Sequence, residues 1–426
     1  MRRITIRILL AALLVLSSHV STGKELATAK PEKVGMSSER LERLSDMNQK
    51  YVDEGKFAGV VTMVARHGKI IHLDAAGTYG VDNTKPINQD TLFRIYSMTK
   101  PITAIALMML YEEGAFQLND PVSKFLPQFA NMKVWTMEGA VDAKTPITMH
   151  QLLTHTAGLS YGFDPENPVD KLYRELRKTP AADLDAFIDN LVELPLLFEP
   201  GERWHYSVAS DVLGAVAEKI SGMSFAQFLQ QRVFDPLDMD NTFFNVPGEK
   251  ADLFATNHRW DPKSKQLTPL LAGSPLYSSH TDVSLFLGGH GLVSTIGDYM
   301  KFAEMMRNGG KLNGARLLSP KTIEFMTQNH LGATTQVSSS GEAPSGTLSA
   351  SLQGTGFGLG FGIIMDPAKW GAMSSAGTYF WGGAAGTVFW IDPVEDIVGI
   401  GMVQLMGSPW PFRQEMMVMT YQAMGE

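Results

Sequence analysis

The sequence contains no cysteine, and this absence excludes several kinds of chemistry at once. Disulfides, metal thiolates, thiol nucleophiles and a lipid anchor on cysteine all need that side chain. Basic residues are also too few to balance the acidic ones: 36 Lys and Arg face 44 Asp and Glu, for a formal net charge of −8. A chain this acidic has no electrostatic basis for binding nucleic acid or an anionic membrane, so we expect neither as a partner.

Only one apolar run stands out, and it lies in segment 1–23, MRRITIRILLAALLVLSSHVSTG. Arginines precede an apolar core of nine residues, and small polar residues follow, which is typical of a secretory signal peptide. The core is too short to span a bilayer. Cleavage near Gly23, with Ser21 and Ala29 as alternative sites, would remove three arginines and take the formal charge from −8 to −11. We expect an exported protein, periplasmic or secreted, without a membrane anchor.

The order of strand-like and helix-like patterns predicts the domain organisation. A helical pattern at 37–55 precedes a β-hairpin that turns at His67-Gly68-Lys69, and strand patterns such as GFGLGFGIIM return from Gly356 before a last helix in PFRQEMMVMTYQAMG. Helical patterns fill the middle of the chain. We predict one α/β domain formed by residues 30–117 and 247–426, with residues 118–246 inserted as a helical domain. The Ser/Gly/Thr-rich stretch at 333–354 is predicted to be an exposed loop.

Two serines compete for the role of nucleophile. Ser160 lies in GLSYG, which matches the G-x-S-x-G elbow of another hydrolase fold. That elbow needs a strand before it and a helix after it, whereas MHQLLTHTA is helix-like and FDPENPVD cannot begin a helix cleanly. We therefore predict that Ser160 belongs to a structural Gly-rich loop.

Ser97 has a more favourable context, in LFRIYSMTKPIT. In S-x-x-K, the serine and lysine lie on one helical face, so the Lys100 amine can reach the Ser97 hydroxyl. Pro101 fits a helix only near its start, which places Ser97 at the N-terminus of an apolar helix, where the dipole favours negative charge. On spacing alone, an ordinary helix N-cap is the alternative interpretation.

Two further stretches could complete such a site. Tyr206, in FEPGERWHYS, precedes a helical segment, and a tyrosinate beside a protonated lysine can act as general base. Trp381-Gly382-Gly383 lies in a strand-like run, where glycines permit close approach to the backbone, and an amide at its end could pair with the Ser97 amide as an oxyanion hole. The alternative interpretations are that Tyr206 is a buried tyrosine with a satisfied hydroxyl, and that Trp381-Gly382-Gly383 is an aromatic residue beside a β-bulge.

Taken together, these motifs resemble the serine β-lactamase and penicillin-binding-protein-like superfamily of class C type, and most closely the family VIII carboxylesterases. The resemblance runs from about Lys33 to the end and includes ITMHQLLTHTAGL, GGHGLVSTIGDYMKFAEMM and FWGGAAGTVFWIDP. It implies a β-lactamase-like fold: an antiparallel sheet flanked by helices, with an inserted helical domain.

The resemblance also implies roles for individual residues. Ser97 would be the acylated nucleophile, with Lys100 and Tyr206 as its general base and acid partners. The amides of Ser97 and Ala384 would form the oxyanion hole. The segment Trp381-Gly382-Gly383 would bind substrate.

Two departures from the class C pattern bear on the substrate. Tyr-x-Asn becomes Tyr206-Ser207-Val208, and Lys-Thr-Gly becomes Trp381-Gly382-Gly383. Losing a charge-assisted hydrogen bond to a substrate carboxylate costs about 1.5–3 kcal/mol. Neutral short-chain esters are therefore the expected substrates. The alternatives are a β-lactamase or D-alanyl-D-alanine carboxypeptidase acting on β-lactams or peptidoglycan stem peptides, and a non-catalytic scaffold.

Ten histidines raise the question of a metal site. They are scattered, with no H-E-x-x-H and no tight carboxylate cluster, so we expect neither a metal nor another cofactor. His155, in LLTHTAGL, is interpreted as a structural residue that holds its loop. The sequence gives no indication of the oligomeric state.

Overall fold

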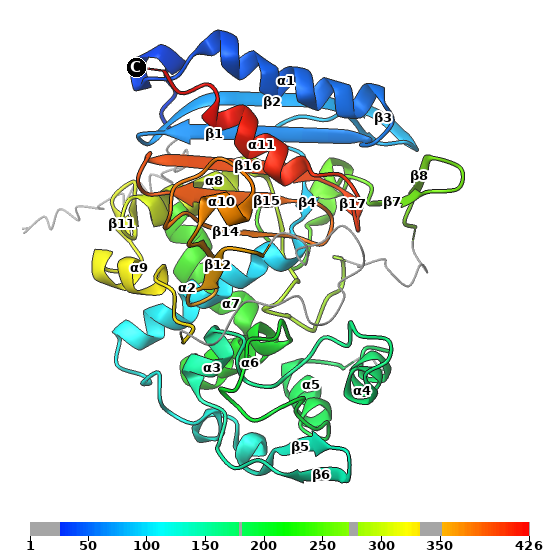
Figure 1. The fold of residues 1–426 in the computed structure, drawn as a ribbon, viewed down its shortest axis with the longest axis vertical. Helices are drawn as coiled ribbons and strands as arrows, with labels where there is room; N and C mark the ends of the chain where they lie inside the picture. The colour runs from blue at the N-terminus through cyan, green and yellow to red at the C-terminus, as the bar shows by residue number, and fades with distance from the viewer. Residues whose placement is uncertain (1–25, 179–180, 272–279, 333–351, 426) are drawn as a thin grey trace, which may run out of the picture.

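The structure is a computed structural model that describes residues 26–178, 181–271, 280–332 and 352–425. Its main element is an eight-stranded antiparallel sheet in the order β12-β13-β14-β15-β16-β1-β2-β3 (Figure 1). The strands are β1 (Gly59–Arg66), β2 (Lys69–Gly80), β3 (Asn83–Pro86), β12 (Thr355–Phe357), β13 (Gly362–Ile364), β14 (Tyr379–Gly382), β15 (Val388–Asp392) and β16 (Ile397–Val403). At its centre, β1 pairs with β16, so the two ends of the chain form one sheet.

Helices cover both faces of the sheet and form a second region at one end of the molecule (Figure 1). They are α1 (Ser38–Asp53), α2 (Thr99–Glu112), α3 (Met149–Leu153), α4 (Pro168–Leu176), α5 (Leu184–Leu191), α6 (Ala209–Ser221), α7 (Phe225–Leu229), α8 (Ile296–Arg307), α9 (Pro320–Met326), α10 (Pro367–Trp370) and α11 (Phe412–Tyr421). Helices α1 and α11 lie on one face of the sheet, whereas α8 packs on the other.

Side chains that alternate along the strands explain this layering. Thr62 of β1 accepts a hydrogen bond from Asn48 of α1 at 2.7 Å, and its cross-strand partner Gly401 faces α11. On the opposite face, the ring of Phe389 in β15 lies 5.1 Å from that of Tyr299 in α8. Because the central strands are buried on both faces, β1 reads as a nearly continuous apolar run.

The middle of the chain gathers at the other end of the molecule. Helices α3 to α7 lie there with the hairpin β5 (Lys133–Thr136) and β6 (Gly139–Asp142) (Figure 1). Helix α2 connects the two regions, since it packs against α6 and is buried along almost its whole length. The residue limits predicted above for the two domains stay a prediction.

Several sequence predictions can be compared with these elements. The helix at 37–55, the hairpin that turns at His67-Gly68 and the last helix are confirmed as α1, β1–β2 and α11. Interpreting GFGLGFG as one strand was wrong, because a turn separates β12 from β13, with Gly360 at φ +90°. The predicted signal peptide and most of the Ser-rich stretch lie outside the described residues.

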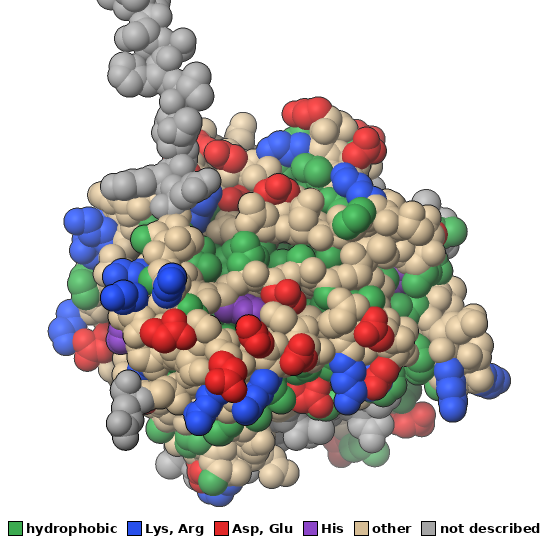
Figure 2. Space-filling view, turned by 90° about the horizontal axis from the view of Figure 1, so that it is seen from above, with side chains coloured by type: hydrophobic (Ala, Val, Ile, Leu, Met, Phe, Trp, Pro, Cys, Tyr) green, Lys and Arg blue, Asp and Glu red, His purple; other side chains and the backbone are tan. Residues whose placement is uncertain are grey.

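Two surface properties bear on partners. Among the residues that the structure describes, no helix combines the length and the apolar character that crossing a membrane requires. The face seen from the α1 side carries acidic and basic side chains interspersed with hydrophobic ones (Figure 2). That the protein binds neither nucleic acid nor a membrane stays a prediction.

We predict that Gly399→Ala destabilises the sheet. Gly399 of β16 pairs with Trp390 of β15, and a Cβ added at this glycine would lie 2.3 Å from the indole ring. Such overpacking should lower the free energy of unfolding by about 1–3 kcal/mol. Gly297→Ala, in α8, is the matched control and should not destabilise, because the added Cβ would meet nothing within 4 Å beyond its chain neighbours and the nearby backbone of its own helix. Urea unfolding of both variants measures this, and equal midpoints would contradict the prediction.

Candidate active site

Ser97 lies in a 3-10 turn, Tyr96–Met98, directly before α2. The helix predicted from Ser97 onward therefore begins two residues later, at Thr99, although the serine still stands at its N-terminal end. The strand pair β4 (Phe93–Arg94) and β9 (Val293–Ser294) holds the segment that leads into this turn. Ser97 is half-buried, so its hydroxyl is within reach of a small molecule.

The backbone before Ser97 is strained. Tyr96 has φ +44°, in the left-handed region that a bulky residue rarely occupies. Its hydroxyl accepts a hydrogen bond from Asn257 Nδ2 at 2.9 Å, which helps to hold this conformation. Strain of this kind costs on the order of 1–3 kcal/mol and concentrates at functional sites.

Lys100 is buried beside Ser97 and donates three hydrogen bonds. Its Nζ lies 3.3 Å from Ser97 Oγ, 2.9 Å from the Tyr161 hydroxyl and 2.6 Å from the Gly289 carbonyl oxygen. An ammonium group has three N–H donors and no acceptor. The surroundings of Lys100 therefore suit the protonated form, with its positive charge 3.3 Å from the serine oxygen.

A buried carboxylate completes this cluster. Asp211, near the start of α6, accepts a hydrogen bond from the Gly289 amide at 2.7 Å and a longer one from the Tyr161 hydroxyl at 3.5 Å. Burial raises the pKa of Asp211 to about 6, although the Lys100 charge pulls it down. Burial and the same carboxylate raise the pKa of Tyr161 well above its usual value, so this tyrosine stays a neutral phenol.

Tyr206 lies on another side of Lys100. The lysine Nζ is 4.6 Å from the centroid of the Tyr206 ring, and the Tyr206 hydroxyl accepts a hydrogen bond from the indole N–H of Trp381 at 3.4 Å. Tyr206 is partly exposed, whereas Trp381 is 1% exposed. The structure thus assigns Trp381 a contact with Tyr206, and substrate binding by Trp381 stays a prediction.

The turn after β14 lies against the residue that precedes the serine turn. A Cβ added at Gly383 would meet the Ile95 carbonyl oxygen at 2.4 Å, so only glycine permits this approach. Within the described residues, the Ala384 amide donates no hydrogen bond to another protein group. This arrangement suits the predicted oxyanion hole, in which the amides of Ser97 and Ala384 would take part.

Ser160 occupies a different position. It is fully buried, and its Oγ donates to Asp170 Oδ1 at 2.5 Å and lies 3.4 Å from His205 Nε2. In a catalytic triad the histidine stands between the serine and the carboxylate, whereas here the carboxylate contacts the serine directly. A substrate cannot reach a fully buried hydroxyl, and these contacts fit a structural role for Ser160.

His155 holds the segment that carries Tyr206. Its Nδ1 accepts from the Ser207 amide at 3.3 Å, and its carbonyl oxygen accepts from the His205 amide at 2.8 Å. Burial and the nearby Lys100 lower the pKa of His155 well below its usual value, which keeps the ring neutral. These contacts fit the structural role that the sequence predicted.

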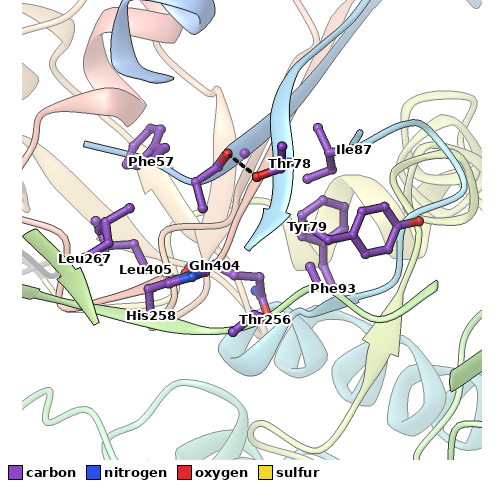
Figure 3. A pocket seen from close by; sticks show the side chains of 13 residues that line it. Phe57, Thr78, Tyr79, Ile87, Phe93, Thr256, His258, Leu267, Gln404 and Leu405 are labelled. Atoms are coloured by element: carbon purple, nitrogen blue, oxygen red, sulfur yellow. Dashed lines mark hydrogen bonds between the residues drawn. The ribbon is translucent and has the colours of Figure 1, made fainter. Parts of the chain in front are cut away.

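A separate cavity lies at the ends of β1 and β2 (Figure 3). Its lining is mostly apolar and contains none of the predicted site residues. His258 in this lining accepts from the Val81 amide and contacts the Gln404 carbonyl oxygen, so both of its ring nitrogens are occupied. Within the described residues there is no cluster of His, Asp and Glu that could hold a metal ion.

Sequence reasoning missed three members of the site, namely Tyr161, Asp211 and Gly289. Tyr161 follows Ser160 in GLSYG, and nothing in that motif marks the tyrosine itself. Asp211 gave no signal either, because it lies seven residues before Glu218 and so falls on the polar side of the helical pattern in ASDVLGAVAEKISG. Gly289 must be glycine, since a Cβ there would lie 2.6 Å from the Tyr161 hydroxyl.

Comparisons with known proteins show the family of this chain. The family model described as Beta-lactamase matches residues 44–421. Protein Rv1367c of Mycobacterium tuberculosis is 34% identical over 360 residues, which cover 83% of this chain and 87% of that protein. Esterase EstB of Burkholderia gladioli is 30% identical over 371 residues, which cover 82% of this chain and 86% of that protein.

A solved structure extends the likeness to the fold. The structure of EstCE1, a hydrolase with promiscuous acyltransferase activity, superposes with a TM-score of 0.75 at 28% identity and covers 90% of this chain and 97% of its own. The antiparallel sheet with its flanking helices is thus a β-lactamase-like fold, and the relatives include esterases. The chain belongs to the beta-lactamase family of serine hydrolases.

Proposed function

We propose that this protein is a serine carboxylesterase that cleaves short-chain esters through an acyl-enzyme on Ser97. The observation that carries the proposal is the placement of a reachable Ser97 hydroxyl 3.3 Å from the buried Lys100 amine. The likeness to Esterase EstB supports the ester as the substrate class.

The reaction would run in two steps with the same groups. In the first, Tyr206, acting as a tyrosinate, takes the proton of Ser97 Oγ as this oxygen bonds to the ester carbonyl carbon, and the alcohol leaves with that proton. In the second, Tyr206 takes a proton from the water that attacks the acyl carbon, the bond between that carbon and Ser97 Oγ breaks, and the proton passes to Ser97 as the carboxylic acid leaves. The oxyanion of each tetrahedral intermediate would accept from the amides of Ser97 and Ala384.

The two tyrosines around Lys100 differ in their fitness as general base. Tyr161 is buried and hydrogen-bonds to both Lys100 and Asp211, and its raised pKa keeps it protonated. Tyr206 is partly exposed, with the Lys100 Nζ over its ring and the Trp381 indole N–H donating to its hydroxyl. We therefore assign proton transfer to Tyr206 and a supporting contact to Tyr161.

Trp381 also bears on the substrate. At the position where class C β-lactamases carry a lysine, this chain has an indole that cannot bind a substrate carboxylate as a cation would. Neutral esters need no such cation, whereas β-lactams and D-alanyl peptides carry a carboxylate. Hydrolysis of a chromogenic cephalosporin at rates comparable to esters would favour the β-lactamase alternative.

We predict that p-nitrophenyl butyrate hydrolysis depends on Ser97 and not on Ser160. Ser97→Ala should lower kcat by at least about a thousandfold, since the nucleophile is lost. Ser160→Ala should keep kcat, while its thermal midpoint falls because the buried Asp170 loses a donor, a loss of about 1–3 kcal/mol. Activity lost in Ser160→Ala and kept in Ser97→Ala would overturn the assignment.

The two tyrosines give a matched pair of phenylalanine variants. Tyr206→Phe should lower kcat by about a hundredfold or more, which is the usual contribution of a general acid–base group. Tyr161→Phe keeps the aromatic packing and should lower kcat by about tenfold, because it removes one hydrogen bond to Lys100. Steady-state kinetics on both variants test this, and a reversed order would transfer the base role to Tyr161.

The pH profile should show the titration of Asp211. Above about pH 6 its carboxylate is charged and faces Lys100 and Tyr161, with His290 4.0 Å away and Arg177 nearby. Below that pH the carboxyl is neutral and the lysine loses its counter-charge, so kcat/KM should fall. Asp211→Asn should remove this limb and lower activity at pH 8 by roughly tenfold. An unchanged acid limb in Asp211→Asn would contradict the assignment.

A further inference from the structure

We propose that Arg413 is a positioning residue that orients and polarises the oxyanion-hole amide of Ala384, a role that rests on the proposed function. Arg413 lies at the start of α11, on a different element from every catalytic group named above. No sequence motif marked it.

The contact that carries this inference is made to the peptide that the oxyanion hole would use. Arg413 Nη2 donates to the Gly383 carbonyl oxygen at 2.7 Å and to the Thr387 carbonyl oxygen at 3.2 Å. The Gly383 carbonyl and the Ala384 N–H belong to one peptide unit. In a planar trans peptide these two groups point in opposite directions. A cation held at the carbonyl therefore fixes the direction of the N–H on the other side.

The same contact strengthens the amide as a donor. A charge-assisted hydrogen bond is roughly twice as strong as a neutral one. Chains of hydrogen bonds polarise one another, so an N–H becomes a better donor when the carbonyl of its own peptide accepts from a cation. Among the described residues, Arg413 has no carboxylate partner in an ion pair that would neutralise it.

Gly382 supplies the room for this guanidinium. A Cβ added at Gly382 would lie 2.6 Å from Arg413 Cζ and 2.7 Å from Nη2. Gly383 is constrained on its own side by Thr387 and by the Ile95 carbonyl oxygen. The two glycines after Trp381 thus make room for different neighbours: Gly382 for the Arg413 guanidinium, and Gly383 for the segment that precedes Ser97. This is a structural reason for their presence, beside the predicted contact with substrate.

The guanidinium also lies near Tyr206. Burial lowers the pKa of Arg413 to about 10, and the Tyr206 hydroxyl opposes that shift. Arg413 therefore stays a cation at neutral pH. Its side chain borders a cavity that is also lined by Trp381 and Trp390, so a truncated variant leaves space for a small guest.

The test compares Arg413→Ala, Arg413→Lys and Gly382→Ala in p-nitrophenyl butyrate hydrolysis. In Arg413→Ala we expect kcat to fall about ten- to a hundredfold with KM within about twofold, because the contact acts on the transition state. Millimolar guanidinium should restore part of this kcat, and Arg413→Lys should retain an intermediate value. Gly382→Ala should show a loss of the same kind, because its methyl group displaces the guanidinium.

Tyr51→Phe is the control for the docking of α11. It removes the 2.6 Å hydrogen bond from the Tyr51 hydroxyl to Glu415 on the same helix, without touching the Gly383 carbonyl, so kcat should not change. Three results would overturn the role of Arg413: an unchanged kcat in Arg413→Ala, a change confined to KM, or a loss that guanidinium does not restore in a folded variant. Thermal melting establishes that each variant is folded.

Labelling of Ser97 by a fluorophosphonate separates this inference from the proposed function. The label needs the nucleophile and the oxyanion hole, but no ester turnover. If wild type takes up label without hydrolysing esters, the esterase proposal fails, and the labelling rates of the Arg413 variants still decide the role of Arg413. If wild type neither hydrolyses esters nor takes up label, both proposals are contradicted.

Discussion

The site depends on one buried positive charge with three acceptors around it. Lys100 cannot leave water without partners, because an unpaired buried ammonium would cost several kcal/mol. Its contacts to Ser97, Tyr161 and Gly289 meet this demand with one acceptor from each of three separate segments. Satisfying one lysine therefore brings together parts of the chain that are almost 200 residues apart.

Contacts that do not involve the lysine also hold these segments in place. Helix α2 is buried between the sheet and the helical region, and the pairing of β4 with β9 joins the chain before Ser97 to the loop that carries Gly289. Contacts of Thr103 to the Gly288 carbonyl and of Thr99 to the Leu292 amide fix the same loop on α2. The strained Tyr96 persists because this framework over-determines its conformation.

Periodicity and turn signals predicted the elements that depend on local patterns. The hairpin of β1 and β2, helix α1 and helix α11 follow from apolar spacing and glycine turns. The pattern failed in GFGLGFG, where alternation continues through a turn, because alternation alone does not show where a strand reverses. Motif spacing also placed Ser97 beside Lys100, since those residues share one local turn.

The rest of the site is set by long-range contacts that one sequence does not display. Tyr161, Asp211 and Gly289 meet Lys100 only after α6 and the loop before β9 have packed on α2. Arg413 reaches the Gly383 carbonyl from a helix on the far side of the turn, and no local pattern marks a lone arginine in α11. The motif residues could thus be named in advance, whereas the groups that orient them required the fold.

The measurement that tests the central claim most directly is the mass of the acylated peptide after a rapid acid quench with p-nitrophenyl butyrate. Trypsin separates the two candidate serines, because Lys144 lies between Ser97 and Ser160. The account predicts a butyryl group on the wild-type peptide that carries Ser97. It predicts no butyryl group on the corresponding peptide of the Ser97→Ala variant. A butyryl group on the Ser160 peptide, or turnover without any acylated serine, would contradict it.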